Sequence, residues 1–87
     1  MSVMLIVCDP SANAESALEG AIADYDGTKV VEGCFLIKTK EHPRLVASMV
    51  EKHLPPDTTF YVFELDRRYD GFGPVDVNKW LKKNLKK

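Results

Sequence analysis

The run VMLIVC at residues 3–8 is the feature that most restricts how this chain can fold. Its six apolar residues include β-branched Val and Ile and no polar interruption, which predicts a strand buried on both faces. The run stops at Asp9 and Pro10, so a carboxylate stands where a rigid strand ends. Such an acid is either a catalytic or metal-binding group or the first polar residue of a turn.

Two amphipathic helices are expected after this strand. Apolar residues recur at three- and four-residue spacing in residues 14–25, with Ser11 or Asn13 as cap and an end near Asp26 and Gly27. The same spacing in residues 43–54 predicts a second helix, which accepts Pro43 in its first turn and is stopped by a double proline.

The remaining segments predict three more strands and a final helix. Residues 29–32 and 34–39 form a hairpin around a Glu32–Gly33 turn or bulge. In the strand that ends at residue 65, alternation divides the side chains between two faces: Phe60, Val62 and Glu64 on one, and Tyr61, Phe63 and Leu65 on the other. The last segment, VDVNKWLKKNLKK, sets Val77, Trp80, Leu81 and Leu85 on one side of a short helix and lysines on the opposite side.

This order of elements is β-α-β-β-α-β followed by a helix, which predicts a ferredoxin-like α+β fold over residues 1–87 as one domain. The expected sheet is antiparallel with strand order 4-1-3-2, so the unbroken apolar strand is internal. Two helices cover one sheet face. The other face meets solvent, a partner or the C-terminal helix.

Composition excludes several classes of protein. No apolar stretch approaches the ~18 residues of a membrane span, and the apolar N-terminal run is too short for a signal peptide, so we expect a cytoplasmic protein. Cys8 and Cys34 form no CxxC pair and are expected to be inert thiols. The net charge is −1, but residues 77–87 contain five lysines and no acid, so the chain is an acidic body with a basic end.

Common catalytic motifs are missing. His42 and His53 lack metalloenzyme spacing, and a position near a helix end accounts for His53. The GFGP segment at residues 71–74 is no phosphate-binding loop, and the chain contains no G-x-S-x-G.

Asp9 is the strongest candidate for chemistry. The predicted fold brings it to the same sheet end as residues 33–35. One carboxylate is too few for a hydrolytic metal site, so catalysis requires a two-fold axis that brings a second Asp9 close. From the residue alone, an Asx turn before the helix is favoured.

A second candidate is basic and aromatic. Arg67 and Arg68 stand beside Tyr69 and near Phe72, residue types that pair with phosphate and stack on bases. The lysine side of the last helix could follow a phosphate backbone; it comprises Lys79, Lys82, Lys83 and Lys86. Both features also fit a solvated surface, with the arginines paired to Asp66, Asp70 or a neighbouring chain.

Three segments together resemble a known family: the strand ending LIVCD, the hairpin VVEGCFLIKT and the ending FYVFELDRRYDGFGPVDVNKWLKKNL. They are similar to the small ferredoxin-like proteins related to the second CRISPR-associated protein (Cas-two), in particular its SinR-like stand-alone bacterial relatives. The resemblance spans nearly the whole chain.

The resemblance implies a homodimer, often formed by packing sheet faces and exchanging C-terminal segments. It also implies relatives that bind nucleic acid or cut it with a metal ion. It assigns the strand-end carboxylate to Asp9, with Mg²⁺ or Mn²⁺ as cofactor. The family often has a small hydroxyl residue before the aromatic of the third strand, whereas Cys34 precedes Phe35 here. A thiol is a weak hydrogen-bond donor, so this departure weakens the case for nuclease activity.

We therefore expect a Cas-two-like dimer that associates with RNA or DNA. If it is an active endonuclease, paired Asp9 carboxylates hold Mg²⁺ or Mn²⁺ and activate water for phosphodiester hydrolysis; if not, no cofactor is expected. The alternative is a non-catalytic module that binds a protein partner through its sheet face and C-terminal helix. Interface residues are expected to be Phe60, Phe72 and Trp80. An acylphosphatase-like enzyme is disfavoured, because no anion-binding Arg follows the first strand.

Overall fold

The computed structural model of the chain describes residues 1–85. The elements, in chain order, are β1 (Ser2–Cys8), α1 (Ala12–Ala21), β2 (Asp26–Val31), β3 (Cys34–Thr39), α2 (Pro43–His53), β4 (Phe60–Leu65) and α3 (Val75–Asn84).

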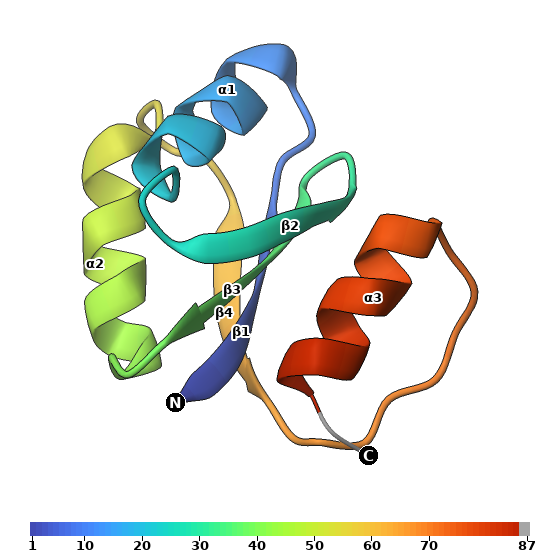
Figure 1. Cartoon of the computed structure of the whole chain (residues 1–87). Helices are drawn as coiled ribbons and strands as arrows, with labels where there is room; N and C mark the ends of the chain where they lie inside the picture. The colour runs from blue at the N-terminus through green and yellow to red at the C-terminus, as the bar shows by residue number, and fades with distance from the viewer. Residues whose placement is uncertain (86–87) are drawn as a thin grey trace.

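The four strands form one antiparallel sheet in the order β2-β3-β1-β4, which confirms the expected ferredoxin-like α+β arrangement (Figure 1). The apolar run of β1 is internal, between β3 and β4. Ile6, fully buried, lies opposite Phe35 on one side and Val62 on the other. Side chains opposite each other in an antiparallel pair share a face, so these three residues mark the face under α1 and α2.

Helices α1 and α2 cover one face of the sheet, and α3 lies on the other (Figure 1). The main core lies between the sheet and the first two helices. Its buried members are Met4, Ile6, Cys8, Leu18, Ile22, Phe35, Ile37, Val46, Val50 and Leu54. Burying one large apolar side chain contributes about 1.5–3 kcal/mol, so this cluster is the main source of stability.

A smaller core lies under α3. Leu85 at the end of the helix packs with Val3 and Leu36 of the sheet. Trp80 lies against this cluster, and its Nε1–H donates to Asp26 Oδ1 at 3.0 Å, which ties α3 to the first residue of β2. The apolar side predicted for the last helix is therefore its packed side.

One predicted boundary is wrong. Helix α1 ends at Ala21, and Asp26 and Gly27 belong to β2 rather than to the helix end. A Cβ on Gly27 would lie 2.4 Å from Leu36 O, so glycine is needed here for close pairing of β2 with β3. The Asp–Gly pair was interpreted as a helix stop because both residue types are also common there.

The same misplaced boundary affects the hairpin: β2 spans Asp26–Val31 rather than the predicted residues 29–32, whereas the later elements agree with the predictions. β2 and β3 are joined by a turn at Glu32 and Gly33, and their register shifts between Lys29 and Val31. Within residues 1–85, no helix has the length and apolarity that crossing a membrane requires.

Candidate functional site

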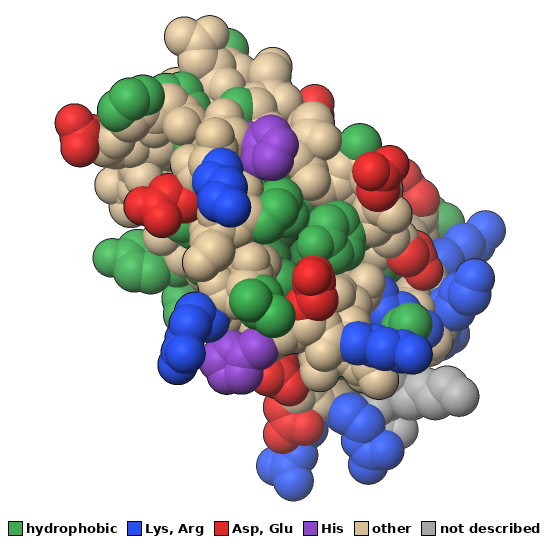
Figure 2. All heavy atoms as spheres, turned by 90° about the vertical axis from the view of Figure 1, so that its left-hand side faces the viewer, with side chains coloured by type: hydrophobic (Ala, Val, Ile, Leu, Met, Phe, Trp, Pro, Cys, Tyr) green, Lys and Arg blue, Asp and Glu red, His purple; other side chains and the backbone are tan. Residues whose placement is uncertain are grey.

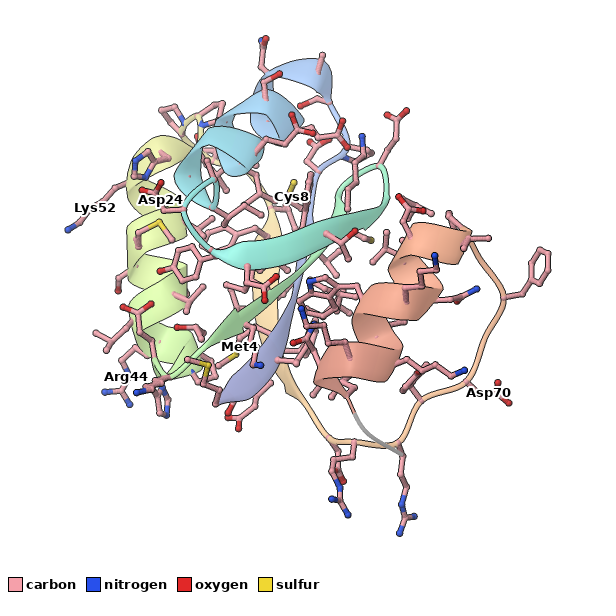
Figure 3. All side chains as sticks on the ribbon, viewed as in Figure 1. Met4, Cys8, Asp24, Arg44, Lys52 and Asp70 are labelled. Carbon is pink, nitrogen blue, oxygen red and sulfur yellow. The ribbon has the colours of Figure 1, made fainter. Side chains whose placement is uncertain are left out.

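The end of β1 holds Asp9 between two other strands, as the predicted fold requires. The backbone N–H of Cys8 donates to Gly33 O at 2.7 Å, and the N–H of Asp9 donates to Thr59 O at 3.0 Å. Figure 3 shows Cys8 at this end of β1, below α1, and Met4 toward the other end. The backbone on both sides of Asp9 is thus fixed by hydrogen bonds.

The Asp9 carboxylate is exposed and takes part in a turn. Its Oδ1 accepts the backbone N–H of Ser11 at 3.0 Å, an Asx turn. Ser11 in turn accepts the N–H of Ala14 through its Oγ at 3.4 Å and caps α1. In one chain the side chain of Asp9 therefore connects β1 to α1.

Glu15, which the sequence did not single out, organises the same end of the sheet. Its Oε2 accepts the backbone N–H of Gly33 at 2.7 Å, and its Oε1 lies 3.0 Å from Lys29 Nζ. The Gly33 hydrogen bond, followed by the bond from Lys29, lowers the pKa of Glu15. The same contact raises the pKa of Lys29. Glu15 clamps the β2–β3 turn to α1.

The residues of one chain do not fit a divalent cation at Asp9. Among residues 1–85 no group of three His, Cys, Asp or Glu side chains is close enough to hold a metal ion. The nearby Glu15 carboxylate is occupied by Gly33 and Lys29. Burial, then the charges of Glu15 and Asp9, raises the pKa of the Cys8 thiol, which disfavours a thiolate ligand. A metal site would need ligands from a second chain.

The opposite end of the sheet has a basic hollow of about 410 Å³. Three cations from three parts of the fold line it: Lys38 of β3, Arg67 after β4 and Lys83 of α3. Its other lining residues are Met1, Val3, Leu65, Asn84 and Leu85. Among residues 1–85, no carboxylate lines it and none of the three cations has an ion pair.

The other predicted cations lie outside this hollow. Arg68 lines a hollow of about 420 Å³ in the 66–70 segment, together with Asp66 and Asp70, and Arg67 borders this hollow as well as the basic one. Lys79 and Lys82 line a third one, of about 330 Å³, which Asp70 also borders. Figure 3 shows Asp70 on the segment that connects β4 to α3 and extends away from the sheet. The prediction for Lys86 falls outside the described residues.

The alternative prediction for the arginines was a pairing with Asp66, Asp70 or a neighbouring chain. Within residues 1–85 the one ion pair is that between Lys29 and Glu15, and Asp66 and Asp70 instead accept the backbone N–H groups of the residues that follow them. The guanidinium of Arg67 is therefore available to a ligand.

The three predicted interface aromatics have different surroundings. Phe60 packs partly buried against the main core, and Trp80 packs against the smaller core under α3. Phe72 is fully exposed, at 105% of its reference area. A role in binding another chain stays a prediction for all three, and Phe72 is the one whose ring is open to solvent.

Two other aromatic side chains, which we did not predict as site residues, are exposed on the sheet. Tyr61 is 62% and Phe63 50% exposed, and their ring centroids lie 6.3 Å apart. The alternation in β4 predicted that they share a face. Their exposure depends on where α3 lies, because α3 packs over β2, at the other edge of the sheet.

The two candidate sites lie far apart in one chain. Val3 lines the basic hollow, and Asp9 follows the other end of the same strand. Six residues of extended chain span about 20 Å. A phosphate held in the basic hollow is therefore too far from Asp9 of the same chain to be the one that Asp9 acts on.

The face made by α1 and α2 shows no comparable cluster of basic side chains among the described residues. Figure 2 shows Lys, Arg, Asp and Glu interspersed over it, with two histidines. His42 Nδ1 accepts the N–H of Arg44 and caps α2, and His53 Nδ1 lies 2.9 Å from Met49 O at the other end. Both histidines have structural roles at the ends of α2.

Comparison with protein-family models, with curated proteins and with solved structures found no match for this chain.

Proposed function

We propose that this chain is a Cas-two-like protein of the cytoplasm that associates with nucleic acid through the basic hollow. The observation that carries the proposal is the convergence of Lys38, Arg67 and Lys83 on one hollow that no carboxylate of residues 1–85 lines. The molecule as a whole has a net charge of −1, so three cations that form no ion pair within residues 1–85 and line one hollow differ from the average surface.

Phosphate is the ligand that this arrangement suits best. A guanidinium can bind phosphate oxygens in a bidentate manner, and lysines supply mobile point charges around it. The cations come from β3, α3 and the segment after β4, so the fold itself holds them together. Binding that depends on three cations is modest in strength and depends strongly on salt.

Salt dependence of binding tests the proposal. We expect fluorescence anisotropy to show binding of a labelled oligonucleotide at low salt. For a single strand, three phosphate contacts predict a slope of about −2 for log K against log salt concentration. Arg67→Ala or Lys83→Ala should reduce the steepness by about 0.7 each and weaken binding to all sequences alike.

Arg44→Ala and Lys52→Ala are the matched controls, because they remove exposed cations from α2, on the side of the sheet away from α3 (Figure 3). They should leave the slope unchanged. Absence of binding at low salt, or equal losses from control and hollow variants, would contradict the proposal.

Cleavage of phosphodiester bonds by this protein requires a homodimer that brings two Asp9 side chains together. One chain lacks a set of three metal ligands among its described residues, so the second copy must complete the Mg²⁺ or Mn²⁺ site. Asp9→Ala should then abolish metal-dependent cleavage without changing the salt slope. Equal cleavage by wild type and Asp9→Ala would remove Asp9 from the chemistry.

A second candidate is a protein-binding module, and the exposure of Tyr61 and Phe63 on the sheet favours it. Aromatic side chains are enriched at protein interfaces. Such a module would bind its partner with little dependence on salt and would not be retained by nucleic acid, so the titration described above separates the two functions.

A further inference from the structure

Only part of the second sheet face is covered. Helix α3 packs over β2, and its end residue Leu85 reaches Val3 and Leu36. Strand β4 lies at the far edge of the sheet, and there Tyr61 and Phe63 stay 62% and 50% exposed. The face therefore presents an aromatic strip, made by Tyr61, Phe63 and their β1 neighbours Val7 and Leu5.

The two rings are placed as separate platforms on an apolar floor. Their centroids are 6.3 Å apart and their planes are inclined by 33°. Tyr61 lies opposite Val7 and Phe63 opposite Leu5, and both β1 residues are half-buried. Because the strand fixes the backbone, each ring can receive a planar partner with little loss of freedom.

The aromatic strip runs into the basic hollow. Alternate residues of a strand share a face and lie about 6–7 Å apart, so Leu65 follows Phe63 on the same face. Leu65 lines the hollow together with Lys38, Arg67 and Lys83. The strip and the hollow form one continuous surface, apolar and aromatic at one end and cationic at the other.

We propose that this continuous surface binds single-stranded nucleic acid, with bases stacked on Tyr61 and Phe63 and backbone phosphates held by Lys38, Arg67 and Lys83. The proposal rests on the proposed function and adds the class of ligand. Unpaired bases offer free faces to aromatic rings, whereas a duplex keeps its bases stacked inside. Phosphates can also pair with the three cations, which form no ion pair within residues 1–85, whereas a purely apolar partner would cover the rings and make no use of these charges.

Ring substitutions combined with a comparison of strands test the proposal. We would measure anisotropy with a short labelled oligothymidylate, an oligouridylate and a duplex of equal length. The single strands should bind more tightly than the duplex. Tyr61→Leu and Phe63→Leu should each weaken single-strand binding by about tenfold, the effect of losing one stacked base, and leave duplex binding unchanged.

Phe63→Tyr is the conservative variant, because it keeps an aromatic ring, and it should bind as the wild type does. Leu45→Ala is the control for loss of an exposed apolar side chain, since Leu45 is 58% exposed on α2. All variants alter exposed residues, and unfolding curves would establish that each is folded.

The possible failures are distinguishable. Suppose that single strand and duplex bind equally and that Tyr61→Leu and Phe63→Leu do not change the binding. This result would overturn the stacking proposal but would not contradict the proposed function. Binding of neither nucleic acid would overturn both. Sedimentation as a dimer that Phe63→Leu dissociates, with oligonucleotide binding unchanged, would show that a second copy occupies the strip and would also overturn the stacking proposal.

Discussion

Gly33 shows how a single residue positions the candidate catalytic end of the sheet. Its φ of +79° lies in the left-handed region, and a Cβ there would lie 2.5 Å from Cys8 O. The carbonyl of Gly33 accepts the N–H of Cys8, and its own N–H donates to Glu15. Glycine is thus needed both for the turn and for the close approach of β1.

Gly33→Ala should therefore lower the free energy of unfolding by about 2 kcal/mol or more, because backbone strain and a clash with backbone add together. Gly20→Ala is the matched control: Gly20 lies in α1 with nothing within 4 Å of an added Cβ. It should stabilise the chain by about 0.5–1 kcal/mol. Denaturant unfolding of both variants checks this, and equal effects of the two would contradict the role given to Gly33.

Glu15 should make stability depend on pH. Its pKa is lowered from the ordinary 4.5 by the Gly33 N–H and by Lys29, so its contribution is present above pH 4.5 and is lost as the pH falls through the lowered value. Glu15→Gln should be less stable than the wild type at neutral pH, and the difference should shrink in acid. Glu51→Gln, on exposed α2, is the control. A difference independent of pH would contradict this account of Glu15.

Sequence reasoning found Asp9 and placed it beside Gly33, because an unbroken apolar run and the order of elements fix the pairing of β1. It missed Glu15, because its partners Gly33 and Lys29 lie fourteen or more residues away in the chain. A glutamate in the first turn of a helix looks the same in sequence whether it binds solvent or clamps a turn.

Tyr25 connects two segments at the end of the sheet where β2 begins and β3 ends. Tyr25 precedes β2 and donates its Oη–H to Glu41 Oε1 at 2.6 Å, in the segment between β3 and α2. This bond, with burial second, raises the pKa of Tyr25 to about 12 from 10. The neutral phenol is therefore the form that stabilises the fold.

The stability that Tyr25 contributes should be fully present below pH 10 and be lost as the pH rises through 12, because the unfolded chain loses this proton first. The difference in unfolding free energy between the wild type and Tyr25→Phe should therefore fall over that range. A Tyr61→Phe variant is the control, as Tyr61 is an exposed tyrosine on β4. A constant difference for Tyr25→Phe would show that the hydrogen bond to Glu41 contributes nothing.

Helix α3 is held to the sheet by apolar packing and one side-chain hydrogen bond. Trp80→Phe removes the Nε1–H that donates to Asp26 and should cost about 0.5–1.5 kcal/mol beyond any loss of packing. Asp26→Asn keeps an acceptor oxygen and should cost less than Asp26→Ala. Circular dichroism during denaturant unfolding measures both, and equal stability of Asp26→Ala and wild type would show that the bond is dispensable.

At the level of elements, the periods of the apolar residues predicted each helix and strand, with one boundary wrong. Gly27 was assigned to a helix end because the need for a residue without Cβ beside Leu36 O arises only when β2 pairs with β3. The exposure of Tyr61 and Phe63 could not be predicted from the sequence either, because the sequence shows that α3 has an apolar side but not which half of the sheet that side covers.

In the whole molecule, the candidate catalytic carboxylate and the basic hollow lie at opposite ends of one sheet. Asp9 follows one end of β1, and Lys38, Arg67 and Lys83 gather at the other. Lys38 was not predicted as a site residue, because it joins Arg67 and Lys83 only through the pairing of β3 with β1 and the packing of α3. In the function that we propose, a single chain binds nucleic acid at the end with Lys38, Arg67 and Lys83, and cleavage at the Asp9 end requires a second chain.

Amide chemical-shift mapping of the isotope-labelled chain, titrated with a short oligothymidylate at low salt, tests this organisation most directly. The account predicts that the largest shifts occur around Lys38, Arg67 and Lys83 and along β4 at Tyr61 and Phe63, with Asp9 and the α1 and α2 face unchanged. Shifts confined to the α1 and α2 face or to the Asp9 end, or no shifts at any residue, would contradict it.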